Sequence, residues 1–369
     1  MNSIKKILYR PFFIRLFNWE YWPFNVVYGP VYLYWLWLCV RARSFFFFNA
    51  ANPSIKNGGF LMESKKEIYD IIPQKYYPPT LFFKAGIDKD DLVNGLCKSK
   101  LQYPLIGKPD IGGRGRGVEK LEIINDVINY AQKSRADFLL QEYIPYNNEV
   151  GIFYYRYPSE DRGHISGIVA KEFLTLVGDG LRTMEELLKK DKRFILQLPS
   201  LQKSYGKKLE RILMKGEECL LVPYGNHARG AKFIDISSLI DEQLVITIDK
   251  ACKEIPGFYF GRMDIKYNTW QDLKDGKNFS IIEVNGAGSE PTHIYDPKHS
   301  IFFAWREIMR HLNILLKISM YNQKNRKIAY LSFKEGLKML QENNEYGKLL
   351  LKDTKPVVDT VVSNLMQLA

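Results

Sequence analysis

Two stretches decide the fold expected for this chain: GRMDIKY, residues 261–267, and FSIIEVNGAGSEPTH, residues 279–293. Their apolar parts predict β-strands, and each strand carries oxygen-bearing side chains: Asp264 on the first, Glu283 and Asn285 on the second. Glu283 and Asn285 share a face because side chains alternate along a strand. Oxygen donors from neighbouring strands suit Mg²⁺, which fills its remaining positions with water and phosphate. We therefore expect a metal site here.

Arg262 lies two residues before Asp264 and so shares its face. A guanidinium at that place can stabilise charge on a transferring phosphoryl group or on a tetrahedral oxyanion. The competing interpretation, polar residues alternating on a solvent-facing edge strand, accounts easily for one such strand. It accounts poorly for two strands in this order.

A glycine-rich stretch, KPDIGGRGRGV, runs from Lys108 to Val118 between a predicted strand and a predicted helix. Glycines let backbone N–H groups approach phosphates closely, and Lys108 adds a positive charge. The spacing matches neither the Walker A motif nor the dinucleotide fingerprint, so a solvated basic hairpin is the alternative.

The stretch LLQEYIPYNNEVGIFYY ends an apolar strand at Glu142 and carries Glu149 seven residues later. A strand that leaves into a hinge offers backbone groups to an adenine edge, and a following carboxylate can accept the ribose hydroxyls. Two surface glutamates would give the same pattern.

Taken together, these motifs and their order resemble the ATP-grasp ligases over roughly Ser64 to Arg310. The segment VGDGLRT, residues 177–183, resembles the cyanophycin synthetase and glutathione synthetase branch. The resemblance implies an α+β, ATP-grasp fold in which two α/β subdomains clamp ATP. It also implies a ligase that joins a carboxylate to an amine or other nucleophile through an acyl phosphate, with Mg²⁺, for which Mn²⁺ can substitute. A nucleotide-binding scaffold without ligase activity is the alternative.

The resemblance also assigns roles to single residues. Lys108 and Lys65 match phosphate-binding lysines, with Lys66 and Lys84 as rivals of Lys65. Arg262 matches the arginine that stabilises acyl transfer, and Arg229 lies in a loop that approaches the γ-phosphate. The remaining matches are the phosphate lid (Gly112, Gly113, Gly115, Gly117), the adenine hinge (Glu142, Tyr143, Ile144), the ribose carboxylate (Glu149) and the metal ligands (Asp264, Glu283, Asn285).

Ser289, Glu290 and His293 fall where the family places its acceptor. Glu290 would bind a substrate amine, and His293 would orient or deprotonate a nucleophile, although a lone histidine beside a turn is more often structural. The sequence GAGSEPTHIYDP differs from the D-alanine ligase pattern, which argues against a D-alanine substrate. Only a short aromatic-rich stretch precedes Ser64, so part of the usual substrate domain is missing or replaced.

Composition favours an anionic partner, because 53 Lys and Arg against 41 Asp and Glu give a net charge of +12. No nucleic-acid-binding motif accompanies this charge. The four cysteines are scattered without paired spacing, which indicates neither a zinc site nor disulfides. A reducing, cytoplasmic location is the simplest interpretation.

The stretch from Tyr21 to Val40 has no charged residue, and four phenylalanines, 45 to 48, follow it. Pro23 and Pro30 predict that only a short helix near Val31 to Arg43 forms, too short to span a bilayer. Tyr and Trp with flanking arginines favour a peripheral position on an anionic membrane, at its inner face, with an apolar or lipid-like substrate. Packing against the catalytic body, or a homodimer interface, is equally expected.

The predicted helices are Glu63 to Ile72, Asp88 to Lys98, Glu119 to Lys133, Thr183 to Lys190 and Asp241 to Ile255. The predicted segments are an aromatic N-terminal segment (1–50), a connector or reduced N-terminal subdomain (51–100), a small subdomain with the glycine lid (101–150), a large subdomain with the metal site (151–320) and a helical C-terminal tail (321–369).

Overall fold

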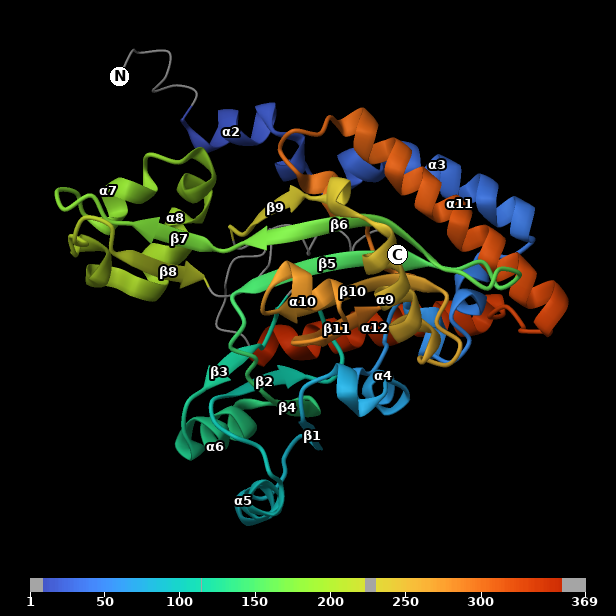
Figure 1. Ribbon diagram of the computed structural model, residues 1–369, viewed down its shortest axis with the longest axis horizontal. Coiled ribbons are helices and arrows are strands. Elements are labelled where there is room, and N and C mark those ends of the chain that lie inside the picture. The colour runs from blue at the N-terminus through green and yellow to red at the C-terminus, as the bar shows by residue number, and fades with distance from the viewer. Residues whose placement is uncertain (1–8, 114, 223–229, 354–369) are drawn as a thin grey trace.

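The structure is a computed structural model of the chain and describes residues 9–113, 115–222 and 230–353. Helices and largely antiparallel strands alternate along these residues, so the predicted α+β class is confirmed. Figure 1 shows two sheet-based bodies, one around β5, β6 and β10 and a smaller one around β2 and β4. This is the two-subdomain arrangement expected from the sequence.

The small sheet has the strand order β1-β4-β2-β3, with β1 at Thr80–Phe83, β2 at Leu105–Pro109, β3 at Glu119–Leu121 and β4 at Phe138–Glu142. Helices α5 (Lys89–Lys98) and α6 (Ile124–Lys133) pack on it. Their apolar side chains Leu92, Val127 and Tyr130 form one core with Phe138 and Leu140.

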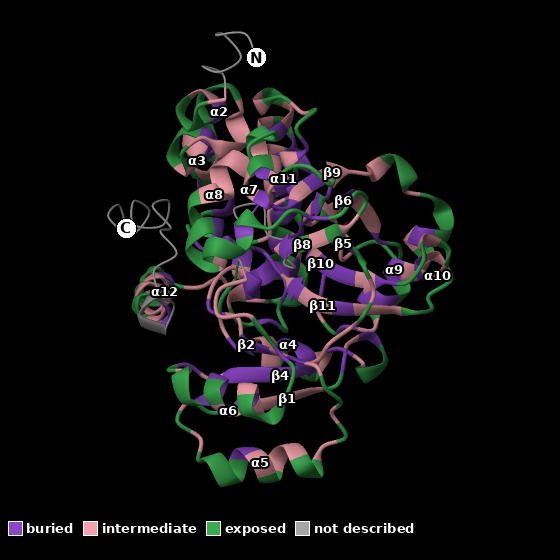
Figure 2. Cartoon of the chain, turned by 90° about the vertical axis from the view of Figure 1, so that its left-hand side faces the viewer, coloured by how far each residue is buried: buried purple, intermediate pink, exposed green. Residues whose placement is uncertain are grey.

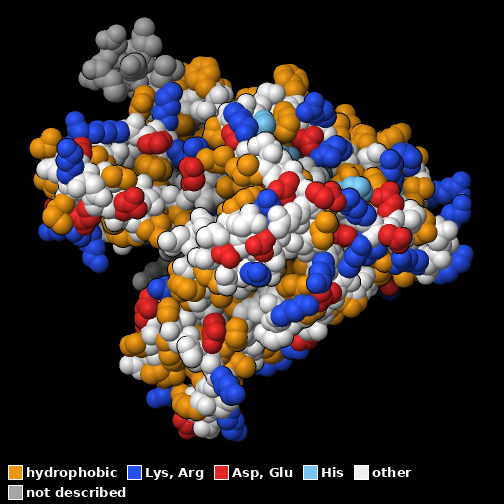
Figure 3. All heavy atoms as spheres, viewed as in Figure 1, with side chains coloured by type: hydrophobic (Ala, Val, Ile, Leu, Met, Phe, Trp, Pro, Cys, Tyr) orange, Lys and Arg blue, Asp and Glu red, His pale blue; other side chains and the backbone are white. Residues whose placement is uncertain are grey.

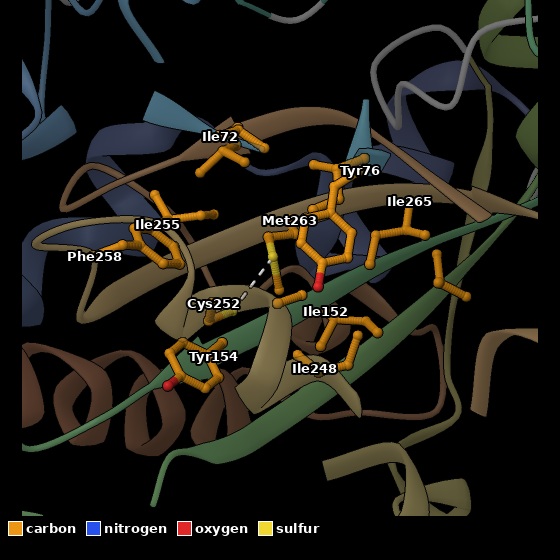
Figure 4. Packing of buried hydrophobic residues seen from close by; sticks show 14 of the residues in the cluster. Ile72, Tyr76, Ile152, Tyr154, Ile248, Cys252, Ile255, Phe258, Met263 and Ile265 are labelled. Atoms are coloured by element: carbon orange, nitrogen blue, oxygen red, sulfur yellow. Dashed lines mark hydrogen bonds between the residues drawn. The ribbon is translucent and has the colours of Figure 1, made fainter. Parts of the chain in front are cut away.

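The large sheet has the order β11-β10-β5-β6-β9. Its strands are β5 (Asn148–Tyr155), β6 (His164–Glu172), β9 (Lys232–Asp235), β10 (Phe260–Tyr267) and β11 (Phe279–Asn285). One face packs against α9 (Glu242–Lys253), where Ile248 and Cys252 meet Ile152, Met263 and Ile265 (Figure 4). Side chains alternate along a strand, so the residues between these, including Arg262 and Asp264, lie on the other face of the sheet.

A third, two-stranded sheet forms a separate lobe. It joins β7 (Leu174–Val177) to β8 (Glu218–Val222) and packs with α7 (Met184–Leu188) and α8 (Lys192–Tyr205). Thr183 and Glu186 make a capping box at the start of α7. Figure 3 shows the surface hollowed between this lobe and the small sheet.

The first and last described helices lie on one flank of the molecule (Figure 2). Helices α2 (Pro11–Phe17) and α3 (Phe24–Ala42) come first, and α4 (Lys65–Ile71) precedes the small sheet. Helix α10 (Trp270–Lys274) joins β10 to β11, and α11 (Ile301–Arg326) and α12 (Phe333–Asp353) end the described chain. Phe46, Phe47 and Phe48 are buried in a core shared with α11, so the predicted packing against the body is observed.

Two predicted helix boundaries are wrong. Helix α3 begins at Phe24 and continues through Pro30, because packing against α11 offsets the one backbone hydrogen bond that a proline removes. The predicted helix from Glu119 begins instead as strand β3, which pairs with β2, and only Ile124–Lys133 is helical. None of the described helices is long and apolar enough to cross a membrane.

Sheet membership bears on the proposed segment boundaries. Strand β1 pairs with β4, so the stretch from Thr80 joins the small sheet, and β5 joins the large one from Asn148 onward. The division into segments itself stays a prediction.

Candidate active site

The two strands that decide the fold lie side by side. Asp264 is the register partner of Glu283, and Arg262 is the partner of Asn285. Side chains directly opposite on antiparallel strands point to the same face, so all four side chains meet on the face away from α9. Asp264 is buried, whereas the Glu283 side chain is 29% exposed.

A β-bulge makes this arrangement possible. The register between β10 and β11 shifts at Asp264 and Ile265, which leaves Ile282 without a partner on β10. One extra residue inverts the alternation, so Ile281 and Val284 both enter the α9 core while Glu283 turns to the opposite face. Simple alternation without the bulge would have put Ile281 and Glu283 on the same face of the sheet.

Four charged side chains form a line across three strands of the large sheet. The Lys171 Nζ atom on β6 lies 2.7 Å from Glu149 Oε1 and 3.0 Å from Asp264 Oδ2, and Arg262 Nε lies 3.0 Å from Asp264 Oδ1. We call Glu149, Lys171, Asp264 and Arg262 the charged seam. The side chains of the first three are at most 8% exposed.

In the charged seam, oppositely charged neighbours shift each other's pKa toward the ionised form. Burial would raise the pKa of Asp264, but Arg262 and Lys171 lower it below its ordinary value. Burial would lower the pKa of Lys171, but the Asp264 and Glu149 carboxylates raise it. Asp264 and its two cationic neighbours, Lys171 and Arg262, therefore stay ionised in a region with little water.

Lys171 is absent from the sequence-based predictions. A signal was available, because Lys171 follows the apolar run GIVA, residues 167–170, inside a strand that also carries buried Val169. A lysine there shares a sheet face with Glu149 or points into the core, and either place requires an acidic partner.

Lys108 stands between the two sheets. Its ammonium donates to the Tyr69 hydroxyl and Gln141 Oε1, both at 2.8 Å, and to the Ile282 carbonyl at 3.2 Å. The bulge frees that carbonyl from the β10–β11 ladder. Burial lowers the pKa of Lys108 to about 8, and the nearby Glu283 carboxylate opposes the shift.

Lys65 begins α4 and faces the same place from the side of the glycine loop. Its Nζ atom lies 3.8 Å from Glu283 Oε1 and donates to the Gly112 carbonyl. Asp110, of the KPD motif, anchors the helix start by accepting from Ser64 Oγ and the Lys66 amide. The rivals Lys66 and Lys84 instead pair at the surface with Asp70 and Asp137.

The glycine loop has the backbone that a phosphate lid requires. Gly112, Gly115 and Gly117 have φ of 133°, 66° and 65°, and a Cβ atom at Gly117 would lie 2.8 Å from Pro109 Cγ. Gly113 has open space where a side chain would stand. Leu350 of α12 lies beside Gly112. Arg229 lies outside the described residues.

At the hinge, two backbone donors are already used. The Glu142 and Tyr143 amides donate to the Pro79 and Pro104 carbonyls, and the Glu142 side chain accepts from the Gln102 amide. The Ile144 carbonyl accepts from Lys266 Nζ at 3.4 Å, and Lys266 also lies over the Tyr143 ring. Adenine contacts at this hinge would therefore come from groups other than these two amides.

The residues predicted to line the acceptor site divide into two places. Glu290 accepts hydrogen bonds from Tyr28 of α3 and from Tyr295, and its backbone carbonyl lies 3.4 Å from Arg262 Nη1. Ser289 Oγ donates to the Asn285 carbonyl at 2.6 Å. We call Tyr28, Ser289, Glu290 and Tyr295 the acceptor region.

His293 lies elsewhere, in a closed cluster. It is 4% exposed, and its Nε2 atom is 3.7 Å from Glu307 Oε2. A Cβ atom at Gly167 would lie 2.2 Å from the His293 ring, so the strand approaches it closely. His311 accompanies it and is paired to Ser166 Oγ at 2.8 Å.

The predicted metal ligands suit Mg²⁺ by their chemistry. Asp264, Glu283 and Asn285 supply hard oxygen donors from adjacent strands. The Asn285 Nδ2 atom is buried without a hydrogen-bond partner, so that amide has a free end for a polar ligand. Among the described residues no group of three His, Cys, Asp or Glu side chains converges, and the predicted triplet holds two carboxylates and one amide.

The chain was compared with family models, curated proteins and solved structures. No family model and no curated protein matches the chain. Solved structures similar to it include a bifunctional glutathione synthetase from Pasteurella multocida (13% identity, 74% of this chain and 36% of that one, TM-score 0.40). Others are the VanG D-Ala:D-Ser ligase from Enterococcus faecalis (15%, 72% and 63%, 0.40) and the D-alanine–D-alanine ligase from Bacillus anthracis (14%, 71% and 68%, 0.39).

The matched part spans about a third of the Pasteurella protein. At 13 to 15% identity the likeness concerns the fold alone.

Proposed function

We propose that this chain is an ATP-dependent ligase that activates a carboxylate as an acyl phosphate and transfers the acyl group to an amine or other nucleophile. The observation that carries the proposal is the convergence of Lys65 and Lys108, from the small-sheet side, on Glu283, beside the seam of the large sheet. The two lysines belong to the small-sheet side, and the Glu283 and Asp264 carboxylates belong to the large sheet. Cations on one side and carboxylates on the other suit the binding of a metal-bound polyphosphate.

In this proposal Asp264, Glu283 and Asn285 hold Mg²⁺, or Mn²⁺ in its place. The metal would neutralise charge on the β- and γ-phosphates. Lys65, Lys108 and Lys171 bind phosphate oxygens, and the glycine loop covers them. Arg262, with its pKa raised by Asp264 and Glu283 against the effect of burial, stays charged to stabilise the acyl-transfer oxyanion. Arg229 is a further candidate for the γ-phosphate.

The reaction has two steps. A substrate carboxylate oxygen bonds to the γ-phosphorus as the bond to the ADP oxygen breaks. The nucleophile then bonds to the acyl carbon, phosphate leaves with that carboxylate oxygen, and the nucleophile loses a proton. Glu290, held by two tyrosines, is the candidate to bind a substrate amine. The chain's contribution is positioning and charge neutralisation.

The test is ADP release against panels of carboxylic acids and amines, with an ¹⁸O-labelled acid once a pair is found. An acyl phosphate requires one labelled oxygen to appear in the released phosphate. The Asp264→Asn variant should release no ADP with the same pair. Unlabelled phosphate would rule out the acyl phosphate, and nucleotide binding without release under any pair would favour a scaffold.

Work at a membrane surface on an apolar substrate, a position at the inner face of the membrane, and a homodimer stay predictions.

A further inference from the structure

Helix α3 is apolar on two opposite faces. Its inner face buries Val27, Val31 and Leu38 beside α11. Its outer face exposes Leu33 (72%), Trp37 (50%) and Val40 (75%), spaced as residues on one side of a helix. A surface helix normally turns polar residues to water, so this second face indicates an interface.

Neighbouring elements extend the outer face. Helix α2 exposes Phe12 and Phe17, each 68%, and lies on the same flank of the molecule as α3 in Figure 2. At the other end Phe45, itself exposed, contacts Phe333 of α12 with ring centroids 5.9 Å apart. We call the exposed apolar side chains of α2 and α3, with Phe45 and Phe333, the outer apolar face.

Within the segment that carries α2 and α3, the exposed charges have one sign. Between Tyr9 and Phe48 the basic residues are Arg10, Arg15, Arg41 and Arg43, and all four are exposed. The single acid in that stretch, Glu20, pairs with Arg193 at 3.1 Å with its side chain 8% exposed. Anionic lipid attracts such residues by about 1 kcal/mol each. Apolar side chains rimmed by arginine complement an anionic bilayer.

The inner side of the same segment builds the acceptor region. Tyr28 donates to the Glu290 carboxylate, and the Val27 carbonyl accepts from Trp305 Nε1 at 2.7 Å. Trp19 stacks on Tyr295 with centroids 5.6 Å apart. One helix therefore carries both the outer apolar face and a wall of the acceptor region.

We propose that the outer apolar face docks on an anionic lipid bilayer and that docking places the acceptor region beside it, so that the substrate is an amphiphile held in that bilayer. The docking proposal depends only on the outer apolar face and the arginines around it. The substrate class rests on the proposed ligase function.

Docking is tested by flotation of the full chain with vesicles of phosphatidylglycerol and phosphatidylcholine, and with phosphatidylcholine alone, without ATP or substrate. The wild type should float with the anionic vesicles only, and added salt should weaken binding. A double variant, Leu33→Glu with Val40→Glu, should lose roughly tenfold or more of the partitioning. Leu181→Glu, at a residue 78% exposed near α7, is the matched control and should float as the wild type.

Equal flotation of the wild type and the double variant would overturn docking. Docking would also be overturned if neither protein floats and light scattering shows that the wild type is a dimer and the double variant a monomer. A second copy of the chain would then cover the outer apolar face. Unchanged melting temperatures show that the variants fold.

The substrate class is tested separately by ADP release. Acids with long chains in anionic vesicles should turn over faster than short soluble homologues, and the double variant should lose that preference while keeping the soluble rate. No preference in the wild type overturns the substrate class alone. No release with any acid overturns the ligase function and leaves the flotation result standing.

Discussion

The charged seam and the cluster of His293, Glu307 and His311 both bury ionisable side chains against the large sheet, and they are built differently. The seam adjoins groups that remain partly open, since the Lys65 and Glu283 side chains are 15% and 29% exposed. The cluster is closed: His311 is 2% exposed, its Nδ1 atom donates to the Glu307 carbonyl, and its Nε2 atom pairs with Ser166 Oγ.

Their protonation differs as well. In the seam, opposite charges hold each other ionised. In the cluster, burial lowers the pKa of His311 to about 3, so this ring is neutral at pH 7. Burial would raise the pKa of Glu307, but His293 and Arg310 lower it to about 2. A seam of full charges can exchange partners with a charged ligand, whereas the cluster holds a fixed internal network.

Breaking the seam should have the largest effect. Lys171→Met leaves two buried carboxylates without their shared cation, which should cost about 3–5 kcal/mol of unfolding free energy in urea. Adding Asp264→Asn should restore part of that loss, because one unpaired charge is removed. Additive losses in this double-mutant cycle would show that the two side chains do not interact.

Glu283→Gln tests the open edge of the seam. The change keeps the shape and removes a charge that faces Lys65, so ligation should fall by roughly 10²–10³-fold with stability little changed. Glu218→Gln, at an exposed residue of β8, is the control. A variant that ligates normally would remove Glu283 from the metal site.

Lowering the pH should destabilise the protein through the closed cluster. The unfolded chain binds a proton at His311 near pH 6.5 and the folded chain only near 3, so stability falls as pH drops through this window. The loss at His311 is about 1.4 kcal/mol at pH 5.5. His311→Gln should flatten this part of the profile in thermal melts. An unchanged slope would mean that another group causes it.

The smallest effect concerns Lys108. With a pKa of about 8 before nucleotide binds, it loses its charge as pH rises, and ATP affinity should fall about fourfold between pH 7 and 8.5. Lys108→Arg should bind with less dependence on pH, because a guanidinium stays charged. Calorimetric titration measures both, and parallel curves would show that Lys108 does not contact phosphate.

Sequence patterns could predict the strands of Asp264 and Glu283, because period-two alternation and flanking turns are local signals. They could not reveal that α3 continues through Pro30, since the compensating contact with α11 is distant in the chain. Lys171 was overlooked because its partners Glu149 and Asp264 lie on other strands. The sequence predicts His293 beside Glu290 because only two residues separate them, although the chain turns between them and buries the ring.

The bulge at Ile282 has a further consequence. It acts as a one-residue spacer on β11, which lets Ile281 and Val284 both face the interior while Glu283 and Asn285 face the charged seam. In a strand of the same length without the bulge, simple alternation would turn Glu283 into the interior and Val284 to the opposite face. The carbonyl of Ile282 also accepts a hydrogen bond from Lys108 of the small sheet, so the bulge helps to position the small sheet against the large one.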